Sequence, residues 1–148
     1  MGQFKMQLAA AQQGNANAQY HCGCLYYDNI VTRQHAIEAF KWFLKSAVQG
    51  HVAAQASVGC CYANGIGVEE NMVEFLKWSL EAANRGDIDA QYNVGCYYAD
   101  DKNTGHDPIV AIKWFKEAAL QGHSKAQYQL DKCCADRRGV KRNTTMAL

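Results

Sequence analysis

Apolar residues recur along the chain at the spacing of amphipathic α-helices. The stretch 54–64 has apolar positions at i, i+4, i+5 and i+8, which share one face of a helix. These positions are Ala54, Val58, Gly59 and Tyr62. The stretch 72–84 carries a second stripe, made of Phe75, Leu76, Ser79, Leu80 and Ala83. Between them, Gly65 and Gly67 supply residues that accept positive φ, so the pattern predicts two helices joined by a turn.

Residues typical of helix ends bound these segments. Asn71 precedes the second helix and Glu74 lies three residues later, which predicts a capping box. Gly86 follows the last turn, as a glycine just beyond a helix should. In the next unit Asp107 and Pro108 fill the same place, as a cap and a first helical residue. Because this is the only proline, no predicted helix interior is interrupted.

The helix pair repeats every 36 residues without gaps. Five residue classes keep this step: Trp42, Trp78 and Trp114; Gly14, Gly50, Gly86 and Gly122; Gly23, Gly59 and Gly95; Tyr26, Tyr62 and Tyr98; Ala47, Ala83 and Ala119. A single pair cannot cover its own apolar faces, so neighbouring pairs must stack. We predict one all-α domain over 1–148, a right-handed α-solenoid of helix–turn–helix repeats. Its expected units are a partial repeat 1–14, repeats 15–50, 51–86 and 87–122, and a partial repeat 123–148.

Glycines in the middle of the first helices predict close packing. Gly23, Gly59 and Gly95 each cost roughly 0.5–1 kcal/mol relative to alanine within a helix. That cost is understandable where a second helix packs against the bare backbone. We therefore expect the partner helix to approach each of these glycines.

The repeat resembles a known family. Its pattern is Ala54-x3-Val58-Gly59-x2-Tyr62-x2-Gly65-x-Gly67-Val68, then Lys77-Trp78 and Ala82-Ala83-x2-Gly86. This pattern resembles the Sel-1-like repeat, a relative of the tetratricopeptide repeat, whose period is 34 residues. The resemblance covers nearly the whole chain. It implies an adaptor that assembles other proteins, as family members do in signalling, in degradation at the endoplasmic reticulum and in bacterial interaction with hosts.

Several positions depart from this pattern. Repeat one has Asn29-Ile30-Val31 at the glycine turn, and repeat three has Lys102-Asn103-Thr104-Gly105. In the fourth unit Asp131 replaces the packing glycine and Cys134 replaces the tyrosine, so this helix is expected to pack more loosely or to end the stack. A helix like the second one of each repeat is expected over 4–13 without its partner, and another begins at 144–148. These ends predict a fragment of a longer array or a self-associating protein.

Composition and charge narrow the partner classes. The 148 residues are 49% hydrophobic with a formal net charge of +1, which predicts a folded domain. Phosphate binding needs a concentrated basic face, so we expect no nucleic acid as main partner. The local basic cluster is interpreted as a solvated helix end and consists of Arg137, Arg138, Lys141 and Arg142. No apolar stretch reaches the roughly 18 residues of a membrane span, and the first residues lack a secretion signal; a cytoplasmic protein is expected.

Candidate catalytic or metal-binding chemistry is sparse. Seven cysteines are present, and those at one repeat position, Cys24, Cys60 and Cys96, would lie about 10 Å apart, too far for disulfides. Free thiols are predicted, with neither metal nor cofactor. His51, Asp87 and His123 occupy the same position in successive repeats. A place at the first turn of a helix explains these residues without a catalytic role. No nucleophile–base pair recurs at workable spacing, so an enzyme or small-ligand binder is the less favoured alternative.

The candidate binding site follows from the resemblance. If the helices stack as in tetratricopeptide arrays, the first helices line a concave face that binds a protein or peptide of some basic character. The expected site residues are Tyr20, Cys24, Tyr27, Asp28, Asn64, Tyr92, Cys96, Asp100, Tyr128 and Lys132. The same reading includes Ala56, Cys60 and Asp136. Two alternatives stay open: these residues cover a solvated face, or the chain self-assembles through its open ends.

Overall fold

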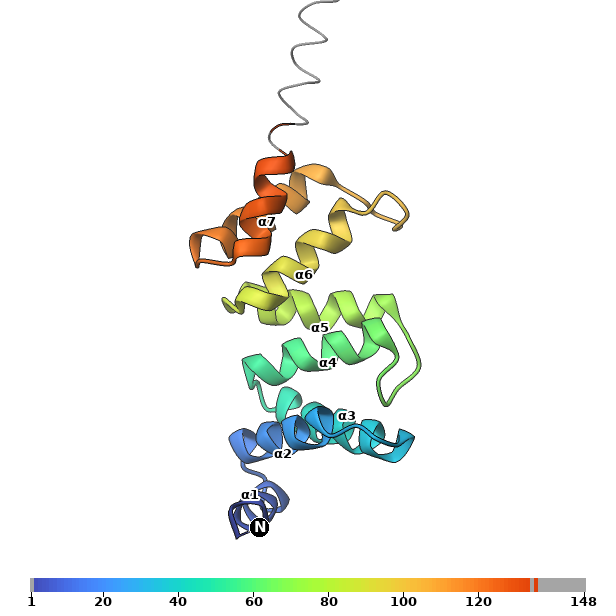
Figure 1. Ribbon diagram of the computed structural model, residues 1–148, viewed down its shortest axis with the longest axis vertical. Coiled ribbons are helices and arrows are strands. Elements are labelled where there is room, and N and C mark those ends of the chain that lie inside the picture. Colours follow the sequence, from blue (N-terminus) through green and yellow to red (C-terminus); the bar gives the residue numbers. More distant parts are fainter. Residues whose placement is uncertain (1, 134, 136–148) are drawn as a thin grey trace, which may run out of the picture. The chain divides into compact units, whose positions relative to one another are not determined.

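The computed structural model describes residues 2–133 and residue 135, and every regular element within them is helical (Figure 1). The helices are α1 (Gly2–Gln12), α2 (Ala16–Asp28), α3 (Arg33–Val48), α4 (Val52–Asn64), α5 (Met72–Asn84), α6 (Ile88–Ala99) and α7 (Pro108–Leu120). A further helical stretch covers 124–133. Helices of the first type are α2, α4, α6 and 124–133, whereas α1, α3, α5 and α7 are of the second type. The predicted all-α class and helix–turn–helix repeat are confirmed.

The chain forms two compact units, Met1–Asp87 and Ile88–Leu148. In the first unit α1 packs on α2, α2 on α3, α3 on α4 and α4 on α5. Its main core is centred on Phe43 of α3 and Val58 of α4, both almost fully buried. In the second unit α6 packs on α7, and Phe115 of α7 shares a core with Ala126 of the following helix.

The helix starts confirm the predicted caps and correct one detail. Asn71 Oδ1 accepts hydrogen bonds from the backbone N–H groups of Val73 and Glu74. However, the Asn71 N–H donates to the carbonyl of Tyr62 at 2.9 Å, so Glu74 is not needed to satisfy it as the capping box supposed. The equivalent Asp107 N–H donates to the equivalent Tyr98 carbonyl at the same distance. In repeats two and three the first helix thus anchors the chain that returns from its own loop.

The turns between the two helices of a repeat differ as the sequence suggested. Gly65 and Gly67 have φ of 68° and 72°, which confirms the predicted positive-φ turn. The turn of repeat one contains no glycine, and no described non-glycine residue takes positive φ. The chain instead ends α2 at Asn29 and caps α3 with Thr32. As a result α3 begins three residues earlier in the repeat than α5 and α7.

The mid-helix glycines mark close helix contacts, as predicted. A Cβ on Gly23 would lie 2.5 Å from the ring of Phe43, and one on Gly95 would lie 2.7 Å from the ring of Phe115. Repeat two differs because Ser79 stands at the phenylalanine position, and its Oγ faces Gly59. The Ser79 Oγ is buried and has no hydrogen-bond partner.

In repeats one and three a buried glutamine of the first helix pairs with an exposed glutamine at the end of the second helix. Gln49 donates to Gln19 and Gln121 donates to Gln91, each at 2.7 Å. In repeat two the Oε1 atom of Gln55 is buried without a partner. Since a buried unsatisfied acceptor costs about 1–3 kcal/mol, repeat two carries a local defect.

Arg85→Gln is expected to stabilise the first unit by about 1 kcal/mol. Arg85 occupies the place of the missing glutamine; on the surface it pairs with Glu81 at 3.0 Å and donates to the Gly50 carbonyl at 3.3 Å. The new amide can donate to Gln55 and so removes a penalty of about 1–3 kcal/mol. The exposed ion pair that is lost is worth only about 0.2–1 kcal/mol, and the lost bond to Gly50 is also exposed to solvent. Urea unfolding followed by circular dichroism measures the change. Arg85→Ala is the control, because it removes the ion pair without supplying a donor; equal stability of the two variants would contradict the explanation.

Candidate functional site

The expected site residues divide between the two units. We call them the first-helix face. In the first unit it comprises Tyr20, Cys24, Tyr27 and Asp28 on α2, with Asn64 at the end of α4. In the second unit it comprises Tyr92 and Cys96 on α6, Asp100 just after it, and Tyr128 and Lys132 on 124–133. Asp136, which the same reading included, lies outside the described residues.

A tyrosine–histidine stack joins the first helices of the first unit. The rings of Tyr20 and His51 lie 4.7 Å apart between centroids and are inclined by 23°. His51 is the N-cap of α4, and its Nδ1 accepts the Ala54 N–H at 3.2 Å. A neutral imidazole therefore carries its proton on Nε2, which lies 2.8 Å from Asn17 Oδ1 and donates to it. This set of contacts fixes α2 against the start of α4.

The second unit repeats this arrangement at equivalent positions. The rings of Tyr92 and His123 lie 4.5 Å apart and are inclined by 17°. His123 Nδ1 accepts the Ala126 N–H at 3.1 Å, and its Nε2 lies 3.6 Å from Asp89 Oδ1. The predicted role of both histidines at helix starts is confirmed.

Sequence reasoning missed the stack, although a signal was present. Tyr20 and His51 have the same separation along the chain as Tyr92 and His123. In repeat two both residues change together, to Ala56 and Asp87. This joint change within one chain could have indicated that the two rings touch.

The half-buried groups of the first-helix face are held in their protonated forms. Burial, followed by a hydrogen bond with Cys24, raises the pKa of Tyr20 to about 12. A hydrogen bond with Cys96, followed by burial, raises the pKa of Tyr92. Burial also raises the pKa of the Cys24 and Cys96 thiols. Since the thiolate is the reactive form, these cysteines are weak nucleophiles and contribute mainly to packing.

The remaining members of the face are exposed. Tyr128 is 67% exposed and Tyr27 is 40% exposed. Asp28 and Lys132 are also exposed. Asn64 and Asp100 form local bonds: the Asn64 amide donates to the Cys60 carbonyl, and an Asp100 oxygen accepts the Lys102 N–H. The face therefore combines rigid, half-buried tyrosines with solvent-exposed ones.

Other chemistry is limited in the part of the chain that the structure describes. Its cysteines are free thiols, as predicted, and Cys61 is buried deeply enough for its pKa to rise to about 12. No group of three or more His, Cys, Asp or Glu residues there could hold a metal ion. None of the described helices combines the length and the apolar character needed to cross a membrane.

The His51 cap is expected to make the first unit sensitive to acid. Burial, followed by the charge of His21, lowers the pKa of His51 below its ordinary value of 6.5. The unfolded chain therefore binds this proton more readily than the folded one. The contribution to stability is fully present above pH 6.5 and is lost as the pH falls through the lowered pKa.

Urea unfolding at several pH values measures this effect. In His51→Asn the cap should be retained, because Asn15 caps α2 in the same way by accepting the Ala18 N–H at 2.9 Å. The variant should lose less stability than the native chain between about pH 7 and pH 5. Equal losses in the two proteins would show that His51 is not the titrating group.

Comparison with known proteins agrees with this geometry. The Sel1 repeat is found three times, at residues 16–51, 52–87 and 88–123. A Sel1 repeat protein from Oxalobacter formigenes is similar in structure, with a TM-score of 0.76 and 30% identity over 89% of this chain and 99% of that one. A protective antigen present in uropathogenic Escherichia coli strains, which displays an SLR fold, has a TM-score of 0.76 and 32% identity.

The antigen match covers 84% of this chain but 27% of the antigen chain, so this chain spans about a quarter of that structure. Comparison with curated proteins gives no match. Proteins with Sel1 repeats are typically scaffolds for protein–protein interaction, and the fold is generally non-catalytic. The three matched repeats cover most of the sequence, and the similar structures are repeat solenoids. The chain therefore belongs to the Sel1 repeat family.

Proposed function

We propose that this protein is an interaction scaffold that binds a peptide or protein on its first-helix face, which forms a concave surface. The observation that carries the proposal is the pair of exposed tyrosines, Tyr27 and Tyr128, on first-type helices. Tyrosine supplies a large contact area at low entropic cost and is enriched among the residues that dominate binding energy.

The surroundings of these tyrosines support the same function. In each unit a tyrosine–histidine stack holds two first-type helices together, so part of the binding surface is rigid before the partner arrives. Preorganisation of this kind reduces the entropic cost of binding. The exposed polar residues of this face, Asp28 and Asn64 in the first unit and Asp100 in the second, suit a peptide with some basic character.

The structure sharpens the choice of variants for testing the proposal. Tyr20 and Tyr92 are half buried between helices, so their replacement would also disturb folding. Tyr27→Lys combined with Tyr128→Lys alters exposed side chains instead. The matched control is Val73→Lys combined with Ile109→Lys, since these residues lie on second-type helices and are 77% and 70% exposed.

Affinity capture from cell extract with the native chain and both variants tests the proposal. We expect a protein that the native chain and the control capture and that the tyrosine variant loses by at least about tenfold. Circular dichroism establishes that all three remain helical. Loss of capture in the control alone would place the binding surface on the second-type helices and contradict the proposal.

Self-association is the second candidate function. It is favoured by exposed apolar side chains on α1, where Met6 is 75% exposed and Phe4 is 36% exposed. Light scattering at increasing protein concentration tests it, with Met6→Lys as the variant expected to weaken association. A constant monomeric mass up to high concentration would remove this candidate.

A further inference from the structure

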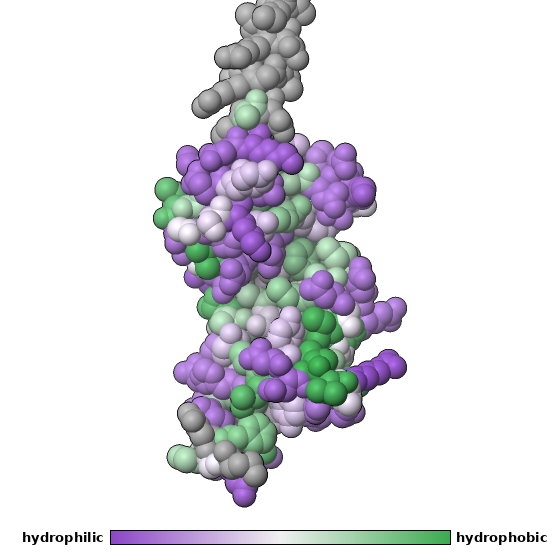
Figure 2. Space-filling view, viewed as in Figure 1, coloured by the Kyte–Doolittle hydropathy of each residue, from purple (hydrophilic) through white to green (hydrophobic). Residues whose placement is uncertain are grey.

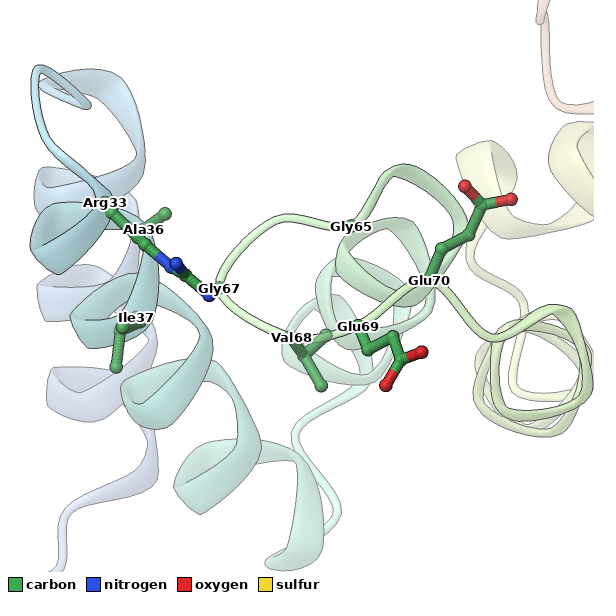
Figure 3. Close-up of a pocket in the computed structure, with 8 residues that line it drawn as sticks. All are labelled: Arg33, Ala36, Ile37, Gly65, Gly67, Val68, Glu69 and Glu70. Carbon is green, nitrogen blue, oxygen red and sulfur yellow. The ribbon is translucent and has the colours of Figure 1, made fainter.

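A pocket of about 500 Å³ lies in the first unit between the start of α3 and the loop that connects α4 to α5 (Figure 3). It is separate from the first-helix face, because its walls come from a second-type helix and a loop. The loop approaches α3 closely at Gly67, where a Cβ would meet the carbonyl group of Ala36 and would lie 2.9 Å from the Cβ of Phe40. The loop therefore contacts α3 at one side of the pocket, whose volume lies within the range of known ligand sites.

The pocket has an apolar wall, and charged residues line it from both the helix and the loop. Ala36 and Ile37 of α3 and Val68 of the loop supply the apolar surface. Arg33 extends from α3 toward Gly67 of the loop, whereas the side chains of Glu69 and Glu70 start from the loop and extend away from α3 (Figure 3). Among the described residues no ion pair joins Arg33 to either glutamate, and all three side chains are exposed. Their charges are therefore available to a ligand.

This arrangement is particular to the contact between repeats one and two. The early start of α3 adds the turn that carries Arg33, and the glycine turn of repeat two leads to Glu69 and Glu70 on the loop. In repeat register the equivalents of Arg33 are Glu69 and Gly105. The charge pattern thus does not follow from the repeat itself. Apolar side chains also gather on part of the first unit among hydrophilic ones (Figure 2).

We propose that this pocket is a second docking site, which binds an extended peptide segment of a partner protein. An apolar side chain of about leucine size enters the pocket. An acidic residue on one side of it pairs with Arg33, and basic residues on the other side pair with Glu69 and Glu70. Charge complementarity with the helix and the loop fixes the direction of the peptide, while the apolar side chain supplies burial.

The test uses two synthetic peptides as probes and the full chain labelled with ¹⁵N. The first is acetyl-Glu-Gly-Leu-Gly-Lys-Lys-amide, and in the second asparagine replaces leucine. We expect the first peptide to shift backbone amide signals of residues 33–37 and 65–70 in a saturable way. The asparagine peptide should shift them much less. No saturable shift with the leucine peptide, equal shifts with both, or shifts confined to other residues would overturn the proposal.

Charge variants of the pocket distinguish specific docking of the peptide from non-specific electrostatic attraction. Glu69→Gln combined with Glu70→Gln should weaken the leucine peptide about 2- to 30-fold, as expected for two exposed ion pairs. Arg33→Glu combined with Glu69→Lys and Glu70→Lys should instead bind acetyl-Lys-Gly-Leu-Gly-Glu-Glu-amide. Tyr27→Lys should leave the binding of both peptides unchanged. Failure of the pocket to bind peptide is therefore distinguishable from failure of the first-helix face to bind its partner. Undiminished binding to the glutamine variant would contradict the assigned contacts.

Discussion

Replacing Phe115 by alanine should destabilise the second unit by about 3–5 kcal/mol. The Phe115 side chain is fully buried, and its ring lies against the Gly95 backbone and 5.9 Å from the Tyr92 ring. Truncation removes this apolar surface and leaves a cavity that the rigid helix pair cannot close. Since a small unit has few kilocalories of stability to lose, α6 and α7 should be largely unfolded in the variant.

Hydrogen exchange of α6 and α7 amides, together with urea unfolding, measures this loss. Leu120→Ala is the control on the same helix, because Leu120 is exposed and should change stability by less than about 0.5 kcal/mol. Similar protection of α6 in the native chain and in Phe115→Ala would contradict the packing described here.

Gly67→Ala has the second large expected effect, a loss of about 2–5 kcal/mol in the first unit. Gly67 has φ of 72°, which costs a residue with a side chain about 1–2 kcal/mol. The added Cβ would also overlap the carbonyl group of Ala36, a backbone contact that cannot move freely. Overpacking of this kind adds about 1–3 kcal/mol.

Gly65→Ala isolates the two causes. Gly65 has a similar φ of 68°, but its nearest neighbours would lie 3.8 Å from the new Cβ. This variant should lose only the roughly 1–2 kcal/mol of backbone strain. Urea unfolding of both variants gives the comparison. If Gly65→Ala is as damaging as Gly67→Ala, the close approach to α3 is not the cause.

Much of the fold could be predicted because the local signals agree with the repeat. Asn71 and Asp107 act as caps, and Gly65 and Gly67 take positive φ, as their residue types require. The step of 36 residues placed the caps of repeats two and three, Asn71 and Asp107, at equivalent positions. Gly95 against Phe115 then follows, since a costly helical glycine implies a close neighbour.

Other features depend on contacts that no single position reveals. The Asn71 N–H bonds to Tyr62 because the loop returns beside α4, which the local sequence does not specify. The early start of α3 is the form that the repeat-one loop adopts when no glycine permits positive φ. The missing partner of Gln55 becomes evident only when Arg85 is compared with Gln49 and Gln121, which occupy the same repeat position and bond to the equivalent glutamines.

The sequence allowed the candidate site to be proposed as a set of helix positions, but it did not show which of these side chains are buried and which are exposed. Sequence spacing placed Tyr20 and Tyr128 in the same class. The structure separates them, since the Tyr20 ring is stacked between α2 and α4 whereas the Tyr128 ring is exposed. Burial depends on the neighbouring helix, and His51 provides that neighbour for Tyr20. The pocket at Arg33 was missed because it arises from two loops of unequal length.

Site-specific photo-crosslinking tests the central claim, binding through the first-helix face, most directly. A photoreactive phenylalanine analogue is placed at Tyr27, Tyr128, Val73 or Ile109, and each protein is irradiated in the presence of the captured partner. We expect crosslinks to the partner from Tyr27 and Tyr128, on first-type helices, and none from Val73 and Ile109. Crosslinks from Val73 and Ile109 alone would show that the partner binds the second-type helices and would contradict the account.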